Sequence, residues 1–239
     1  MQPSGYVIYR GPSLLDGAPI VAIATMRSEN RKTGPMVQTW ILRDDMSPVE
    51  AYRAGADASI CGDCKHRWHL GGACYVNIGH GPGSVWRAWR NWRYPAACSD
   101  PARNAIGAGR RVRLGAYGDP AAVPGAVWRA LIRDAAGHTG YTHQWRNPVA
   151  APLRDLCMAS VDSAAELHAA QSAGWRTFRV TGPAEIFEPG EIECPADARG
   201  KTCAQCMACY GASSGRQAQA SIAITVHGSM ASRFKAAPV

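Results

Sequence analysis

The chain lacks the long hydrophobic runs of membrane proteins. No stretch approaches the roughly eighteen consecutive apolar residues of a spanning helix. The N-terminal segment MQPSGYVIYRGPSLLDG also lacks the charged start, the apolar run and the small-residue cleavage site of a secretory signal peptide. We therefore expect a cytoplasmic protein that does not contact the membrane.

Low-complexity segments and long linkers are absent as well. The chain has 239 residues, 46% of them hydrophobic, which is enough for one sizeable core. Because nothing in the sequence separates a second unit, we expect residues 1–239 to form a single domain.

Acidic residues are outnumbered by basic ones. The 18 Asp and Glu residues face 26 Lys and Arg residues, so the formal net charge is +8. Such a balance favours encounters with phosphate-rich or acidic partners, although on its own it more often serves solubility. Nucleic acid is therefore one partner class to consider.

Cysteine, in contrast, is plentiful. In a reducing compartment the nine cysteines stay as thiols, which disfavours a disulfide framework and favours metal binding or redox chemistry. Seven of them form two groups about 120 residues apart, the first being Cys61, Cys64 and Cys74 and the second Cys194, Cys203, Cys206 and Cys209. Cys98 and Cys157 stand alone, and each is expected to be a small buried hydrophobic residue.

The second group has the spacing of an iron-sulfur site. Cys203, Cys206 and Cys209 form a C-x-x-C-x-x-C loop, which can place each thiolate at a separate corner of a [4Fe-4S] cluster. The fourth ligand of such sites comes from farther away beside a proline, as Cys194 does before Pro195. Tetrahedral zinc is the competing interpretation, but zinc ribbons pair two CxxC knuckles across a short hairpin.

The first group is one ligand short. Its three thiols need a further ligand, which can come from Cys98, His66, His69, His80 or the second group. If the two groups converge, one cluster takes four thiols and the others are structural or bind another metal. If they do not converge, the protein has two metal centres.

Apolar runs alternate with helical patterns along the chain. This alternation predicts an α/β fold with a parallel sheet, either an open doubly wound sheet or a closed or partial (β/α) barrel. Strands are expected at residues 19–26, 36–42, 74–79, 111–117, 139–145, 156–162, 176–182 and 221–228, and helices at 47–56, 83–92, 121–136 and 163–174. Ser47 and Ser163 are expected to begin two of the helices, and Gly174 to end one.

Polar residues recur where the predicted strands end. In a barrel this edge carries the chemistry, so Asp119, His143, Asp162 and His227 are candidate catalytic residues. The two groups of cysteines also fall in loops after predicted strands. For Asp119 and Asp162 a helix-capping role is the competing interpretation, because each precedes a predicted helix.

Five segments together resemble the phage gene-product-eighty-eight family. They are ENRKTGPMVQTWIL, CGDCKHRWHLGGACY, RVRLGAYGDP, CPADARGKTCAQCMAC and TVHG. The resemblance implies a divergent relative of radical SAM barrels that binds an iron-sulfur cluster through the seven grouped cysteines, in the cytoplasm of a phage-infected bacterium. It also implies a cofactor-binding role for Asn30 and Lys32, which with Gly34 match the entry motif. The C-x-x-x-C-x-x-C loop of radical SAM enzymes is missing, so SAM is not expected as a cofactor.

A second partner signal lies in SVWRAWRNWRY. On a helix, Trp86, Trp89 and Trp92 form an aromatic face, with Arg87, Arg90 and Arg93 beside them. Such a face could stack on bases and neutralise phosphates. Alternatively, the tryptophans pack on the sheet and the arginines are solvated.

Three functions thus remain open. The protein could be an enzyme, a redox carrier that receives electrons from a donor protein, or a zinc-stabilised nucleic-acid-binding protein.

Overall fold

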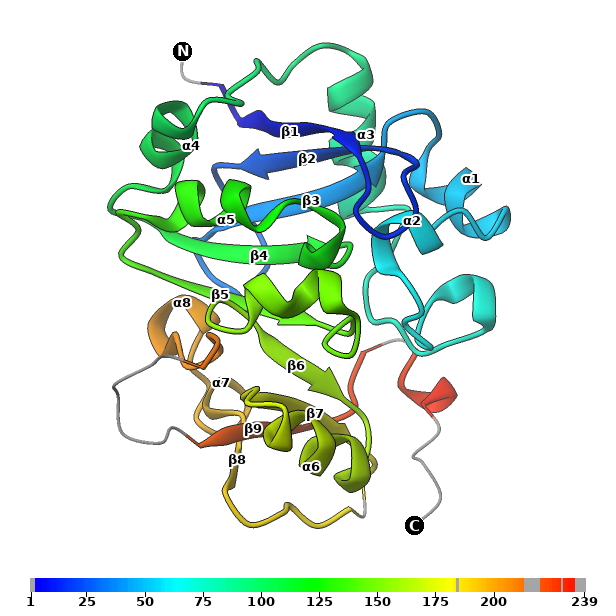
Figure 1. Ribbon diagram of the computed structural model, residues 1–239, viewed down its shortest axis with the longest axis vertical. Coiled ribbons are helices and arrows are strands. Elements are labelled where there is room, and N and C mark those ends of the chain that lie inside the picture. The colour runs from blue at the N-terminus through cyan, green and yellow to red at the C-terminus, as the bar shows by residue number, and fades with distance from the viewer. Residues whose placement is uncertain (1–2, 184, 213–219, 229, 235–239) are drawn as a thin grey trace.

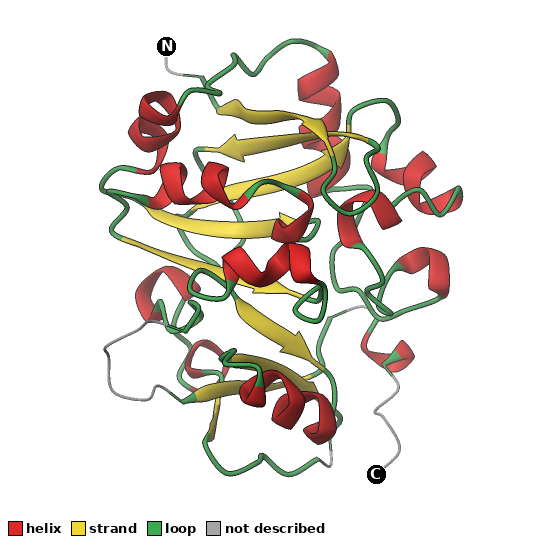
Figure 2. Cartoon of the chain, viewed as in Figure 1, coloured by secondary structure: helices red, strands yellow, loops and turns green. Residues whose placement is uncertain are grey.

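The computed structural model describes residues 3–183, 185–212, 220–228 and 230–234 (Figures 1 and 2). The strands are β1 Gly5–Pro12, β2 Pro19–Thr25, β3 Val37–Arg43, β4 Arg111–Tyr117, β5 Gly137–Thr142, β6 Met158–Val161, β7 Thr177–Thr181, β8 Glu191–Glu193 and β9 Ser221–Thr225. The α-helices are α1 Pro48–Arg53, α2 Ala58–Cys61, α3 Gly81–Arg90, α4 Asp100–Gly107, α5 Gly125–Ile132, α6 Ala164–Ser172, α7 Pro195–Ala198 and α8 Cys203–Cys206. Short 3-10 helices are η1 Trp68–Leu70, η2 Pro120–Ala122, η3 Pro148–Leu153 and η4 Ala231–Arg233.

One nine-stranded sheet runs through the described chain, in the order β1-β2-β3-β4-β5-β6-β7-β9-β8. Strands β1, β2 and β3 pair antiparallel, and every pair from β3 onward is parallel. The α/β class with a mostly parallel sheet is therefore confirmed, while the sheet does not close into a barrel. Its strands follow chain order from β1 to β7, without the reversal of a doubly wound sheet.

Helices lie on both faces of this sheet. In Figure 1, α5 and α6 lie in front of the strands and α3 lies behind β2 and β3, and α5 and α6 are the crossovers from β4 to β5 and from β6 to β7. The amide of Gln171 in α6 donates to the Ser221 hydroxyl, and the Thr177 hydroxyl bonds to the same group. Because side chains alternate along a strand, Phe178 and Ile222 point to the opposite face. That second face carries the candidate site.

The helix boundaries follow from local hydrogen bonds. Ser47 forms a capping box with Glu50, and the Ser163 hydroxyl accepts the Glu166 amide at the start of α6. Gly174 has φ +79°, a left-handed conformation that ends the helix before β7. These three predictions are confirmed.

The sequence-based assignment differs from the structure in several places. Residues 74–79 form a loop without strand pairing, because the chain between β3 and β4 is a long excursion that folds over the pocket. The sequence pattern did not predict the helices α2, α4, α7 and α8 or the edge strands β1 and β8. β1 contains Gly5, Gly11 and Pro12, which are poor strand formers, and β8 is only three residues long. Among the described helices, none is long and apolar enough to cross a membrane.

The contact between α4 and α5 gives a stability prediction. A Cβ atom at buried Gly107 would overlap the carbonyl oxygen of Leu131, a backbone atom that cannot move aside cheaply. Gly107→Ala is expected to lower the free energy of unfolding by about 1–3 kcal/mol, as overpacking does. Urea unfolding measures this. Gly79→Ala is the control, because the nearest heavy atom to its Cβ is 3.6 Å away. Equal stability of the two variants would contradict the α4–α5 packing.

Candidate metal-binding pocket

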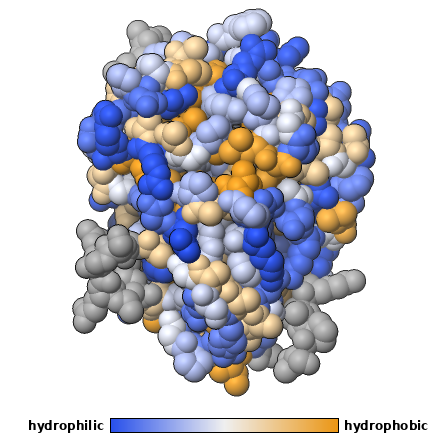
Figure 3. Space-filling model, in the orientation of Figure 1, coloured by the Kyte–Doolittle hydropathy of each residue, from blue (hydrophilic) through white to orange (hydrophobic). Residues whose placement is uncertain are grey.

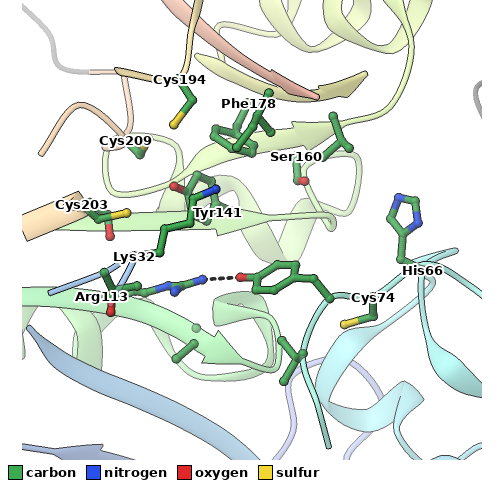
Figure 4. A pocket seen from close by; sticks show the side chains of 18 of the residues that line it. Lys32, His66, Cys74, Arg113, Tyr141, Ser160, Phe178, Cys194, Cys203 and Cys209 are labelled. Atoms are coloured by element: carbon green, nitrogen blue, oxygen red, sulfur yellow. Dashed lines mark hydrogen bonds between the residues drawn. The ribbon is translucent and has the colours of Figure 1, made fainter. Parts of the chain in front are cut away.

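A cavity of about 370 Å³ lies on the sheet face opposite α6 (Figure 4). Alternate residues of the parallel strands form its floor, among them Arg113, Tyr141, Ser160, Phe178 and Ile224. The segment before β3, the excursion between β3 and β4, and the region from β8 to β9 complete its walls. The pocket therefore draws on parts of the chain as far apart as Asn30 and Phe234.

All seven grouped cysteines line this one pocket. Figure 4 shows Cys74 at one end, and Cys194, Cys203 and Cys209 at the other. The first group lies beyond the carboxyl end of β3, as expected. The second group begins directly after β8 with Cys194, in a loop after a strand as expected. The loop then folds back toward the start of β3, where the Lys32 carbonyl oxygen accepts the Cys203 amide at 2.9 Å.

The lone cysteines lie elsewhere. Cys157 is buried in the core, as predicted. Cys98 is exposed, and its thiol contacts the Val7 carbonyl oxygen beside β1. The prediction that Cys98 is buried is therefore wrong, and Cys98 does not line the pocket with the first group.

Backbone hydrogen bonds fix the loop that carries the second group. The Cys194 amide donates to the Ala223 carbonyl at 2.8 Å, so Cys194 continues the ladder of β8 before Pro195 begins α7. Thr202 caps the single turn of α8 in a capping box. Met207 then adopts φ 52°, a left-handed conformation that turns the chain. The C-x-x-C-x-x-C loop is thus wrapped tightly, as its spacing predicts.

The thiols of each group lie near enough to affect one another. Burial raises the pKa of Cys209 to about 12, with nearby Cys194, Cys203 and Cys206 adding to the rise and a hydrogen bond with Tyr141 opposing it. Burial likewise raises the pKa of Cys64 to about 12 and of Cys74 to about 11, the latter with help from Cys64. Buried thiols that repel one another as thiolates are neutral without a cation, and a metal supplies the charge that lets them ionise.

The donor chemistry of the second group fits a thiolate-bound metal. Cys194, Cys203 and Cys209 belong to a small apolar cluster with Met158, Ile222 and Ile224, and such apolar surroundings exclude water from a metal centre. As the side chains stand, no three His, Cys, Asp or Glu residues of the described chain have the arrangement of a metal-ion site.

His66 is the predicted fourth ligand that lies with the first group. It lines the pocket beside Cys61 and Cys64, and its backbone carbonyl accepts the Cys74 amide at 3.0 Å. His69 instead contacts the Tyr52 carbonyl oxygen outside the pocket. His80 is exposed at the start of α3.

Two of the predicted catalytic residues are held by loop contacts. Asp119 is buried, and its carboxylate accepts the Ala121 amide, the Thr142 hydroxyl at 2.7 Å and the His143 amide at 2.7 Å. Burial raises its pKa despite these bonds. The capping interpretation is confirmed for Asp119, which begins η2. His143 follows β5 and lines the pocket.

Asp162 is not a helix cap, because Ser163 takes that role. Its Oδ1 lies 2.9 Å from His66 Nε2, although this contact lacks good hydrogen-bond geometry, and its Oδ2 lies 3.2 Å from Lys65 Nζ. Burial alone would raise the pKa of Asp162, but the nearby His66 and Lys65 lower it below the usual value. Asp162 thus reaches the pocket through His66, which also stacks on Phe234 with ring centroids 5.7 Å apart.

The predicted cofactor residues border the second group. The Lys32 and Thr33 carbonyl oxygens accept the amides of Cys203 and Ala204, and Asn30 Oδ1 accepts the Lys32 amide. Lys32 Nζ pairs with Asp197 at 3.1 Å and lies 2.6 Å from His227 Nε2. Burial and the Lys32 charge lower the pKa of His227, so its neutral ring can accept a hydrogen bond from Lys32 Nζ.

Sequence reasoning missed Arg113, Tyr75 and the Tyr141–Phe178 pair. Arg113 is buried in the pocket floor and donates to the Tyr75 hydroxyl (Figure 4). The rings of Tyr141 and Phe178 have centroids 4.6 Å apart. The available signal was a basic residue in the middle of the apolar strand RVRLGAY, a position where charge is costly.

The tryptophan-rich segment forms α3, as predicted. Trp89 is buried and Trp86 is half-buried, while Arg87 and Arg90 are exposed. The Arg90 guanidinium lies 5.6 Å from the Trp86 ring. The helix therefore packs Trp89 in the core. An interaction of this helix with nucleic acid stays a prediction.

The contacts of Asp119 predict that both carboxylate oxygens are needed. In Asp119→Asn an amide N–H₂ replaces one acceptor and faces a donor, so the free energy of unfolding should fall by about 1–3 kcal/mol in urea titrations. The matched control is exposed Asp134, which accepts one bond from Asn104. Asp134→Asn should change stability by less than about 0.5 kcal/mol. Unchanged stability of Asp119→Asn would show that the loops do not depend on this carboxylate.

Comparison with known proteins adds no relative. No protein-family model matches the chain, and no curated protein or solved structure is significantly similar to it.

Proposed function

We propose that this protein binds a [4Fe-4S] cluster through Cys194, Cys203, Cys206 and Cys209. The observation that carries the proposal is that a distant Cys-Pro and a C-x-x-C-x-x-C loop line the same end of one pocket. Four thiolates are the ligand set of such clusters, and the surroundings are apolar. When bound, the cluster supplies one-electron redox chemistry at the pocket wall.

The charges around the second group support an anionic centre. A cube held by four thiolates carries net negative charge, which is costly to bury without compensation. Arg113 and Lys32 lower the pKa of Cys203 and so favour its thiolate, although burial raises that pKa overall. The Cys203 and Ala204 amides are already used by the carbonyls of residues 32 and 33, so the compensation comes from these cations.

The first group would hold a separate centre. Cys61, Cys64 and Cys74 with His66 offer three sulfur donors and one nitrogen donor, a set that suits zinc or a second iron-sulfur cluster. Cys74 lies at the opposite end of the pocket from Cys194, Cys203 and Cys209 (Figure 4). We therefore propose two centres, one at each end of the pocket.

The strand order also supports the family resemblance. Six parallel strands, β3 to β7 and then β9, follow chain order beside a pocket, which is the arrangement of an open partial barrel. We propose on this basis a relationship to radical SAM-type barrels and to the phage gene-product-eighty-eight family, and hence a site of action in the cytoplasm of a phage-infected bacterium. SAM is not part of the proposal.

The pocket favours an enzyme over a simple electron carrier. A carrier needs a cluster near the surface and no cavity, whereas here the space between the two cysteine groups is large enough for a small molecule. His143 and His227 line this space and can hold or move protons. An electron donor protein would then reduce the cluster. In the alternative, zinc replaces iron and the protein binds nucleic acid.

Metal and sulfide analysis tests the cluster. After anaerobic purification we expect about four irons and four sulfides per chain for one cluster, or about eight of each for two. A broad absorption band that bleaches with dithionite should accompany them. Stoichiometric zinc without sulfide would overturn the iron-sulfur proposal and favour the nucleic-acid-binding alternative.

Single substitutions test which group holds which metal. Cys206→Ala should remove the iron and sulfide of the second group, because four thiolates are needed there. Cys61→Ala should remove only the metal of the first group. The matched control is exposed Cys98, where Cys98→Ala should leave the metal content unchanged. If Cys61→Ala and Cys206→Ala abolish the same metal, the two groups form one centre and the two-centre proposal fails.

A further inference from the structure

Arg113 differs from the other buried arginines of the described chain. Arg43 pairs with Asp45 at 2.7 Å, and Arg179 pairs with Glu191 at 2.6 Å. Arg113 is as buried as Arg43, at 9% exposed, yet no carboxylate of the described residues lies within ion-pair distance of it. A buried charge without a partner is costly, so the position calls for an explanation.

The guanidinium also has donors to spare. It can donate five hydrogen bonds, and in the described chain its one side-chain partner is the Tyr75 hydroxyl. The carboxylates nearest to the pocket are already engaged elsewhere. Asp119 holds the strand-end loops, and Asp162 contacts His66 and Lys65.

The place of Arg113 in the pocket indicates what could use these donors. Figure 4 shows its side chain at the pocket floor between the two cysteine groups, pointing along the cavity toward Tyr75. Tyr141 and Phe178 pack together on the neighbouring strands and present aromatic surface to the same space. The pocket thus combines one cation with an aromatic wall.

We propose that the pocket binds a small molecule with an anionic group, a carboxylate or a phosphate, on Arg113 and an apolar or aromatic body against Tyr141 and Phe178. Arginine binds both anions through parallel N–H donors, and a water-poor wall strengthens the contact. The volume of about 370 Å³ lies within the range of small-molecule sites.

This ligand would lie between the two proposed metal centres. Its role as their substrate rests on the proposed function, whereas its binding to Arg113 does not. A competing explanation is that Arg113 serves only as the counter-charge of the cluster near Cys203. Ligand binding and iron content must therefore be measured on the same variants.

Calorimetry on the anaerobically purified full chain tests the proposal with three probes of similar size. These are 3-phenylpropionate, 2-phenylethyl phosphate and neutral 3-phenylpropanamide. At least one anion should bind about tenfold or more tightly than the amide, because only an anion forms charge-assisted bonds. Which of the two anions binds better distinguishes a carboxylate ligand from a phosphate ligand.

Variants of Arg113 assign the effect to the residue. Arg113→Gln should weaken the preferred anion about tenfold or more and leave amide binding unchanged, with iron content measured on the same sample. Arg111→Gln is the matched control, because Arg111 is exposed on the same strand. Arg113→Lys retains the charge and loses the planar fork, so its loss should be smaller. This variant also serves if Arg113→Gln does not fold.

Three outcomes would overturn the proposal. The first is that neither anion binds, and the second is that the anions and the amide bind equally. The third is that the Arg113 variants lose iron but still prefer anions over the amide as the wild-type protein does. The last result would make Arg113 a counter-charge of the cluster. Absence of iron and sulfide from the wild-type protein contradicts the cluster alone, so the two proposals can fail separately.

Discussion

The parallel hydrogen-bonded ladder from β3 to β9 is the constraint on which the rest of the structure depends. It aligns the strands in one direction, so their alternate side chains point to two faces. Crossover helices need one face, and α5 and α6 fill it. On the other face, loops cover the part of the sheet that α3 leaves free, and the cavity lies between these loops and the strands. The pocket and both cysteine groups therefore follow from the direction in which the strands pair.

Many of the strands and helix ends could be predicted from the sequence, because they depend on patterns of neighbouring residues. The apolar runs of β2, β3 and β4, the cap at Ser47 and the left-handed Gly174 depend on residues a few positions apart. Edge strand β8 was beyond prediction, because its three residues gain their structure only from pairing with β9. The spacing of the cysteines predicted which of them belong to each group. It did not predict that the two groups lie at opposite ends of the cavity.

The position of the second group depends on contacts between distant segments. Its loop follows a strand, yet it folds back because the Gly140 amide and the carbonyls of Lys32 and Thr33 bind its backbone. Residues that sequence reasoning assigned to a cofactor thus also support the loop that carries the thiols. Arg113 was missed for the same reason. A basic residue on an apolar strand reads as exposed until the fold shows that both faces are covered.

The separation of the two groups has a chemical consequence for whatever lies between them. Two metal centres at the ends of one cavity can act on a bound molecule from both sides only if that molecule has a fixed orientation. A cation at one point of the floor and an aromatic wall beside it supply such orientation, because the anionic end and the apolar body of a ligand then have different places. Arg113 near Cys203 is suited to both tasks, since its charge can offset a cluster and fix a ligand at once. Under both proposals, a guanidinium that has no carboxylate partner among the described residues would link the proposed metal centres to the choice of ligand.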